Sequence, residues 1–183
     1  MTKVFIGGSR RLTRLGPDVR RRLDRIMDKG LAVLIGDANG ADKAVQRYLK
    51  SRDYQNVEVF CTNGVCRNNL GEWPSRPVQA SPGAKGFDFY AAKDICMAEE
   101  GSVGFMLWDG ESKGTLANIL RLVDQGKKVV LYIGPTRQFA TLRSRSDCES
   151  MNLVSPRKRK GKLRHWATSS ESSSRLRPEA GLF

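Results

Sequence analysis

The sequence has few of the residues that usually hold metal ions. Among its 183 residues there is a single histidine, His165, and only four cysteines, of which Cys61 and Cys66 lie close together. Structural zinc sites usually take four Cys or His ligands in two closely spaced pairs, and no second pair exists here. We therefore expect no metal site, and we expect reduced cysteines without a special role.

Long apolar runs are also lacking. No run approaches the roughly 20 residues that a membrane-spanning helix needs. The first residues, Met1 to Gly8, contain a short apolar stretch that is too quickly followed by charge to resemble a secretory signal. We therefore expect a cytoplasmic protein without a membrane span.

Hydrophobic residues make up 39% of the chain, and the deficit lies mostly in the last thirty residues. A basic run occupies residues 157–162, and residues 169–174 are nearly all serine. The length allows one domain with a real core and a tail. We expect residues 1–143 to form that domain and residues 144–183 to be a basic, Ser-rich, disordered tail.

The net charge of +13 favours anionic partners. Residues 1–142 hold 22 basic and 15 acidic side chains, and residues 143–183 hold 10 and 4, so both parts are basic. Charge alone does not choose among nucleotides, nucleic acids and anionic surfaces. Nucleic-acid binding through the basic tail is one open alternative, and a solvated tail without a partner is another.

Apolar runs typical of buried strands alternate with helix-type patterns, which specifies a parallel sheet covered on both faces. We predict an α/β fold: a Rossmann-like three-layer sandwich with a mostly parallel five-stranded sheet and helices on both faces. Segment 62–86 lacks periodicity and is expected to be a lid or flexible loop, with Arg67, Trp73 and Arg76 able to reach a ligand. The strands are expected at 3–8, 31–35, 57–60, 103–107 and 128–133, and a last helical turn at 136–143.

Glycine-rich polar turns follow three of these strands, at residues 7–11, 36–42 and 109–115. In parallel sheets, ligands bind outside the carboxyl ends of the strands, where these turns lie. Glycines allow close backbone approach, and a helix start with free N–H groups is an anion site. We expect the three turns to hold a phosphorylated or ribosylated small molecule.

Each turn contributes candidate ligand-binding residues with a distinct chemistry. Ser9 and Arg10 are expected to contact phosphate, and Asp37 and Asn39 to bind ribose hydroxyls. For the two latter residues, turn stabilisation is an equally open reading. The full candidate set is Gly7, Gly8, Ser9, Arg10, Gly36, Asp37, Asn39, Gly40, Asp109, Gly110, Ser112, Lys113, Gly114, Thr115 and Asn118.

Three turns, in this order, resemble the signature turns of the SLOG superfamily and most of all those of its YspA-like branch: Gly7-Gly8-Ser9-Arg10, Gly36-Asp37-Ala38-Asn39-Gly40-Ala41-Asp42 and Asp109-Gly110-Glu111-Ser112-Lys113-Gly114-Thr115. The resemblance covers about residues 1–142. It implies a Rossmann-like fold, a nucleotide or nucleotide-derived ligand, and a role as a sensor or processing domain. Related families include cytokinin-activating phosphoribohydrolases and the DNA-processing protein A family, and many relatives are homo-oligomers.

One departure bears on catalysis. Phosphoribohydrolases and deoxyribosyltransferases carry a glutamate that acts at the sugar carbon, and the matching position here is Asn118. An amide is neither a carboxylate nucleophile nor a general base. An N-glycosidase or deoxyribosyltransferase-like hydrolase is therefore kept as an alternative without assigned catalytic residues, with Glu111, Asp37, Asp42 or Asp109 as open substitutes. No cofactor other than the nucleotide-type ligand is expected.

Overall fold

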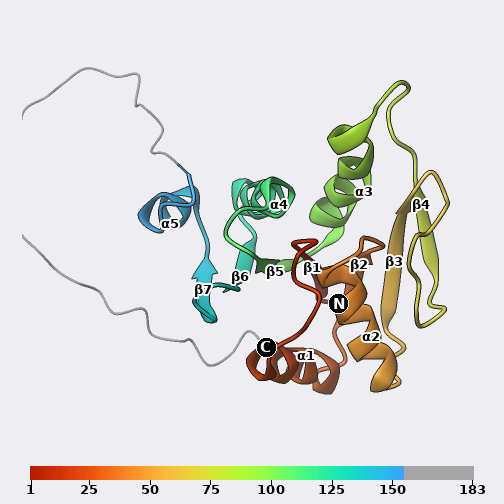
Figure 1. Cartoon of the computed structure of the whole chain (residues 1–183), viewed down its shortest axis with the longest axis horizontal. Coiled ribbons are helices and arrows are strands. Elements are labelled where there is room, and N and C mark those ends of the chain that lie inside the picture. Colours follow the sequence, from red (N-terminus) through yellow and green to blue (C-terminus); the bar gives the residue numbers. More distant parts are fainter. Residues whose placement is uncertain (155–183) are drawn as a thin grey trace, which may run out of the picture.

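The protein is built on one seven-stranded sheet, and this computed structural model describes residues 1–154 (Figure 1). The strand order is β4-β3-β2-β1-β5-β6-β7, and every neighbouring pair is parallel except β6 with β7. The fold is thus the predicted Rossmann-like α/β sandwich, with two more strands than expected. The strands are β1 (Lys3–Gly8), β2 (Ala32–Gly36), β3 (Val57–Thr62), β4 (Ser75–Val78), β5 (Val103–Trp108), β6 (Lys128–Ile133) and β7 (Gln138–Leu142).

Helices cover both faces of the sheet. Helices α1 (Pro17–Asp28) and α2 (Ala41–Ser51) pack on one face, and α3 (Gly86–Glu100), α4 (Lys113–Asp124) and α5 (Arg145–Ser150) on the other (Figure 1). Strand β1 shows why its apolar run is continuous. Val4 and Ile6 face the core under α1 and α2, whereas Phe5 faces the core under α3 and α4, so both faces of the strand are buried.

The two unexpected strands correct the sequence interpretation. Residues 136–143 do not form a helical turn, because the chain reverses after β6 through a four-residue turn and returns as the antiparallel strand β7. Segment 62–86 contains β4 at the other edge of the sheet. It also contains Trp73, which is 4% exposed and donates its indole N–H to the Tyr54 carbonyl at 2.9 Å. This part of the segment is core and sheet edge, and a short edge strand has too few residues to show a periodicity.

The folded domain also continues past the boundary expected at residue 143. Ser144 and Asp147 form a capping box at the start of α5. Cys148 on this helix is fully buried in the core beneath α4. Residues 144–154 therefore belong to the domain, and the predicted basic and Ser-rich runs of the tail lie outside the described residues.

The cysteines differ from the expectation that all are reduced. Cys61 and Cys66 form a disulfide with their Cα atoms 5.0 Å apart. Asn63 and Gly64 between them have positive φ angles, which turn the chain back on itself and bring the two cysteines together. Cys96 and Cys148 are free.

Within residues 1–154, no helix is both long and apolar enough to cross a membrane. The same residues contain no cluster of three or more His, Cys, Asp or Glu side chains placed to hold a metal ion.

Candidate functional site

The candidate site lies where the chain changes direction across the sheet. From β1 the chain builds β2, β3 and β4 on one side, then crosses to β5, β6 and β7 on the other. The loops after β1 and β5 therefore diverge, and such switch points are where ligands bind in open α/β sheets. The three glycine-rich turns follow β1, β2 and β5, which are neighbours in the sheet.

Ser9 joins the three turns to one another. Its hydroxyl lies 3.2 Å from Thr115 Oγ1 and accepts the Asp109 N–H at 3.0 Å. Its carbonyl accepts the Ala41 N–H at 3.2 Å. Ser9 is fully buried, so its role in the structure is to hold the turns together.

Two glycines permit this close approach. A Cβ on Gly8 would lie 2.5 Å from the Leu107 carbonyl oxygen of the neighbouring strand. A Cβ on Gly40 would lie 2.2 Å from the Arg10 carbonyl oxygen, and Gly40 also has φ +86°. Backbone contacts this short leave no room for any other residue at either position.

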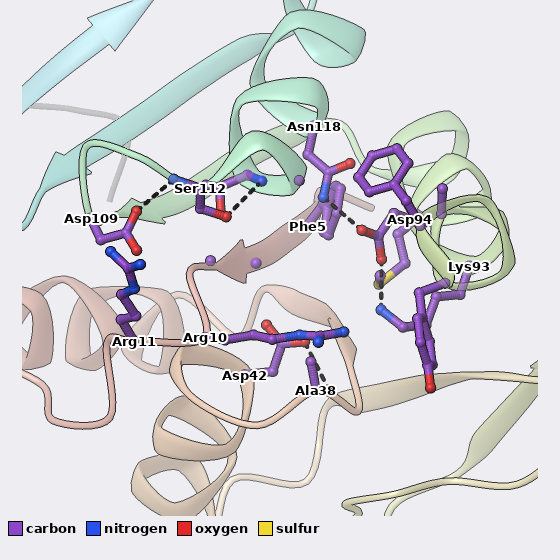
Figure 2. A pocket seen from close by; sticks show the side chains of 18 of the residues that line it. Phe5, Arg10, Arg11, Ala38, Asp42, Lys93, Asp94, Asp109, Ser112 and Asn118 are labelled. Carbon is purple, nitrogen blue, oxygen red and sulfur yellow. Dashed lines mark hydrogen bonds and ion pairs between the residues drawn. The ribbon is translucent and has the colours of Figure 1, made fainter. Parts of the chain in front are cut away.

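A cavity of about 610 Å³ opens beside these turns, between the end of β1 and helices α3 and α4 (Figure 2). Of the sequence-predicted residues, eight line it: Gly7, Gly8, Arg10, Asp109, Ser112, Gly114, Thr115 and Asn118. The other seven are not among its lining residues: Ser9, Gly36, Asp37, Asn39, Gly40, Gly110 and Lys113.

Helix α4 begins at the cavity. Ser112 is its N-cap, and its hydroxyl accepts the Thr115 N–H at 3.4 Å. The first-turn N–H groups of Lys113 and Gly114 have no acceptor among residues 1–154. Asp109 organises the turn before the helix, since its carboxylate accepts the N–H groups of Glu111 at 3.0 Å and Ser112 at 2.8 Å. Burial works against ionisation of Asp109, but these backbone hydrogen bonds outweigh it and lower its pKa.

Charged side chains lie at the α3 side of the cavity (Figure 2). Lys93 is 3% exposed, and its ammonium donates to Asp94 Oδ1 at 2.6 Å. Burial lowers the pKa of Lys93, but the carboxylates of Asp94 and Asp42 outweigh that and raise it. Asp42 is 5% exposed, and burial raises its pKa to about 6 although Lys93 opposes the shift. Desolvated ionisable groups of this kind at a cavity are typical of functional sites.

Asn118 holds Asp94 in place. Its side-chain amide donates to Asp94 Oδ2 at 2.9 Å (Figure 2). Its own carbonyl accepts from Arg121 at 2.6 Å. Residue 118 is therefore an amide that orients a carboxylate from the neighbouring helix α3.

Asp37 and Asn39 are engaged within the fold. Asp37 is 2% exposed and accepts three hydrogen bonds from Arg67, two from the guanidinium and one from the backbone N–H. Burial opposes ionisation of Asp37, but the Arg67 hydrogen bonds lower its pKa. Asn39 accepts from the side chain of Asn68 at 3.1 Å. That Asp37 and Asn39 bind ribose stays a prediction.

Arg67 lines the cavity, as its proposed reach toward a ligand requires. Its guanidinium lies over the Tyr90 ring at 4.3 Å, and that of Arg10 lies 5.4 Å from the same ring. Of the two other side chains expected to reach a ligand, Trp73 is in the core. Arg76 forms ion pairs with Glu58 and Glu100 away from the cavity.

Sequence reasoning missed the roles of Lys93 and Asp94. On α3, Phe87 and Ile95 are 57% and 40% exposed, whereas Lys93, Met97 and Ala98 are buried. Lys93 and Met97, four residues apart, therefore lie on the buried face of the helix. The sequence signal for this ion pair is a lysine at helical spacing from an apolar residue, Lys93 four residues before Met97. A lysine on a buried helix face needs a charged partner.

No protein-family model matches this chain, and no curated protein sequence matches it.

Proposed function

We propose that the cavity binds a nucleotide or a nucleotide-derived small molecule, and that the protein is a sensor or processing domain for it. The observation that carries the proposal is the start of α4. The free N–H groups of Lys113 and Gly114 mark the positive end of a 12-residue helix, and this helix start borders the cavity. A phosphate group is the anion that such a helix start binds most often in α/β folds.

The remainder of the cavity suits the rest of a nucleotide. Its volume falls within the range of roughly 300–1,000 Å³ typical of small-molecule sites. Phe87 and Tyr90 supply aromatic surface for a base, and the Arg10 guanidinium supplies a second positive charge. The resemblance of the three turns to the SLOG superfamily and its YspA-like branch supports the same ligand class, and a nucleotide ligand is consistent with the cytoplasmic location expected from the sequence.

The test is a melting-temperature shift with adenine and guanine nucleotides, made in wild type and in a matched pair of variants at Gly114. Gly114 has ordinary φ, and a Cβ there would make only van der Waals contact with Phe87 at 3.6 Å. Gly114→Asp places a carboxylate at the helix start and should abolish the shift by repelling phosphate. Gly114→Asn introduces a side chain of the same shape without the charge, so this variant should retain most of the melting-temperature shift. Equal shifts in both variants, or no shift in wild type with any nucleotide, would contradict the proposal.

A second candidate function is hydrolysis or transfer at the N-glycosidic bond of a nucleotide. The specific observation in its favour is Asp94, a carboxylate that lines the cavity and is oriented by Lys93 and Asn118. A carboxylate so placed can act at a sugar carbon in place of the missing glutamate. Incubation with nucleoside monophosphates, followed by chromatography for free base, tests it. We expect wild type to release free base and Asp94→Asn not to release it. If wild type releases no base from any nucleoside monophosphate, this candidate function is excluded.

A further inference from the structure

Three charged groups from two elements meet at one end of the cavity. Lys93 Nζ lies 2.6 Å from Asp94 Oδ1. A Cβ built on Gly36 would lie 2.6 Å from both Lys93 Nζ and Asp42 Oδ2, so these two atoms are at most twice that distance apart. The ammonium of Lys93 therefore lies close to two carboxylates, and we refer to Asp42, Lys93 and Asp94 as the charged triplet.

The triplet has unused hydrogen-bonding capacity that faces the cavity. An ammonium has three donors, and Lys93 uses one of them on Asp94. Asp42 Oδ2 accepts the Ala38 N–H at 3.2 Å, whereas Asp42 Oδ1 accepts no hydrogen bond from residues 1–154. Among these residues, Thr62 Oγ1 is the one enclosed side-chain atom without a partner. Asp42 Oδ1 is therefore not sealed in the core, and the cavity that Asp42 lines gives access to it.

This pattern of acceptor, donor and acceptor selects among the parts of a nucleotide. A phosphate would face two carboxylates and be repelled, so it is better placed at the start of α4. An amino group would face the Lys93 ammonium. Two adjacent hydroxyls fit, because each one donates to a carboxylate while its oxygen accepts from the nearby ammonium.

We propose that the charged triplet binds the vicinal 2′- and 3′-hydroxyls of a ribose, so that the ligand is a ribonucleotide and not a 2′-deoxyribonucleotide. The proposal rests on the proposed function of the cavity. A ligand that lacks one hydroxyl leaves unused the hydrogen-bonding capacity that the triplet presents to that hydroxyl. Since hydrogen bonds to charged groups are the stronger ones, we expect a loss of affinity of about 10- to 100-fold for each missing hydroxyl.

Calorimetric titration of the full chain separates this proposal from the binding proposal. The probes are AMP, 2′-deoxy-AMP, 3′-deoxy-AMP, and pyrophosphate as a sugar-free anion. Both deoxynucleotides are expected to bind at least about 10-fold more weakly than AMP. Equal affinities for AMP and the deoxynucleotides would overturn the diol proposal but leave the proposed nucleotide binding intact. Binding of pyrophosphate as tight as that of AMP would have the same consequence, because the ribose would then add nothing to the affinity. Failure of every probe to bind would overturn both proposals.

Variants then test which residues of the charged triplet distinguish a ribonucleotide from a 2′-deoxyribonucleotide. The ratio of AMP to 2′-deoxy-AMP affinity is the readout, because a merely structural role for the triplet would change both affinities together. Asp94→Asn should reduce the ratio to less than about 3-fold, since the amide no longer supplies a charged acceptor. Asp88→Asn, on an exposed part of the same helix, is the matched control and should keep the full ratio. An unchanged affinity ratio in both Asp94→Asn and Lys93→Met would overturn the assignment of the ribose hydroxyls to the charged triplet. If those variants do not fold, the ratio measured with wild type decides whether the protein recognises the diol.

Discussion

The hydroxyl oxygens of Ser9 and Thr115 lie 3.2 Å apart although 106 residues separate them in the chain. One residue follows strand β1 and the other belongs to the first turn of α4. Both are buried, so their contact joins the two sides of the switch point beside the cavity. Variants at Ser9, Thr115 and Gly40 test how far the fold depends on this convergence of the turns.

Ser9→Ala should destabilise the fold more than Thr115→Ala. Loss of the Ser9 hydroxyl leaves the part-buried Asp109 N–H without its acceptor, which costs about 1–3 kcal/mol, whereas Thr115→Ala should cost about 1 kcal/mol. The two hydroxyls contact each other, so the double variant should show a coupling of at least about 0.5 kcal/mol. Urea unfolding measures all three, with Thr136→Ala, exposed in the β6–β7 turn, as a control that should be near neutral. Strict additivity would mean that the contact does not stabilise the fold.

Gly40→Ala should destabilise the domain by more than about 3 kcal/mol, because its Cβ would overlap the Arg10 carbonyl and its backbone has a conformation that L side chains rarely adopt. Gly30→Ala is the control. Gly30 also has positive φ, but a Cβ there meets nothing within 4 Å, so only the conformational cost of about 1 kcal/mol remains. Thermal or urea unfolding of both variants gives the comparison, and similar losses would show that the turns after β1 and β2 are not in close contact.

Arg67→Met should cost about 2–3 kcal/mol, a value reduced from that of a fully buried pair because the Arg67 side chain is 32% exposed. The cost arises because Asp37, 2% exposed, loses its charged partner. Arg11→Met is the control, since its ion pair with Glu111 is 74% and 71% exposed and should contribute less than about 0.5 kcal/mol. Methionine keeps much of the apolar stem in both cases. Equal effects on the free energy of unfolding would contradict the structural role assigned to Asp37.

Asp42 should make stability depend on pH between about 4 and 7. Burial raises its pKa from the ordinary value of 3.8 to about 6, so the folded state favours the protonated carboxyl. The resulting stabilisation is complete below the unfolded pKa and is lost as pH rises through about 6, a change of about 3 kcal/mol. Lys93, Asp94 and Asp37 are the charged groups whose fields act on Asp42.

The measurement is the free energy of unfolding of wild type and Asp42→Asn across this pH range. The variant cannot ionise at residue 42, so its stability relative to wild type should rise by about 3 kcal/mol from pH 4 to pH 7. Asp28→Asn, exposed at the end of α1, should leave the pH dependence of wild type unchanged. A parallel pH dependence of Asp42→Asn and wild type would show that Asp42 is not desolvated.

The sequence by itself determined the fold class and the position of the three turns. Continuous apolar runs such as Val4-Phe5-Ile6 are local signals of a strand buried on both faces, and the alternation with helical patterns specifies a parallel sheet. Glycines at strand ends are also local signals, so the turns at residues 7–11, 36–42 and 109–115 could be assigned to one edge. The site residues on these turns that line the cavity, such as Arg10 and Ser112, followed from that assignment.

Only the tertiary structure decided which groups meet at the cavity. The strand order places β1 between β2 and β5, and pairing across the sheet sets that order, which no single segment encodes. The same holds for the antiparallel return of β7, the disulfide between Cys61 and Cys66, and the burial of Lys93 close to Asp42 and Asp94. A charged side chain becomes buried only when its partners arrive from other elements, so its role is settled by packing and not by its neighbours in the sequence.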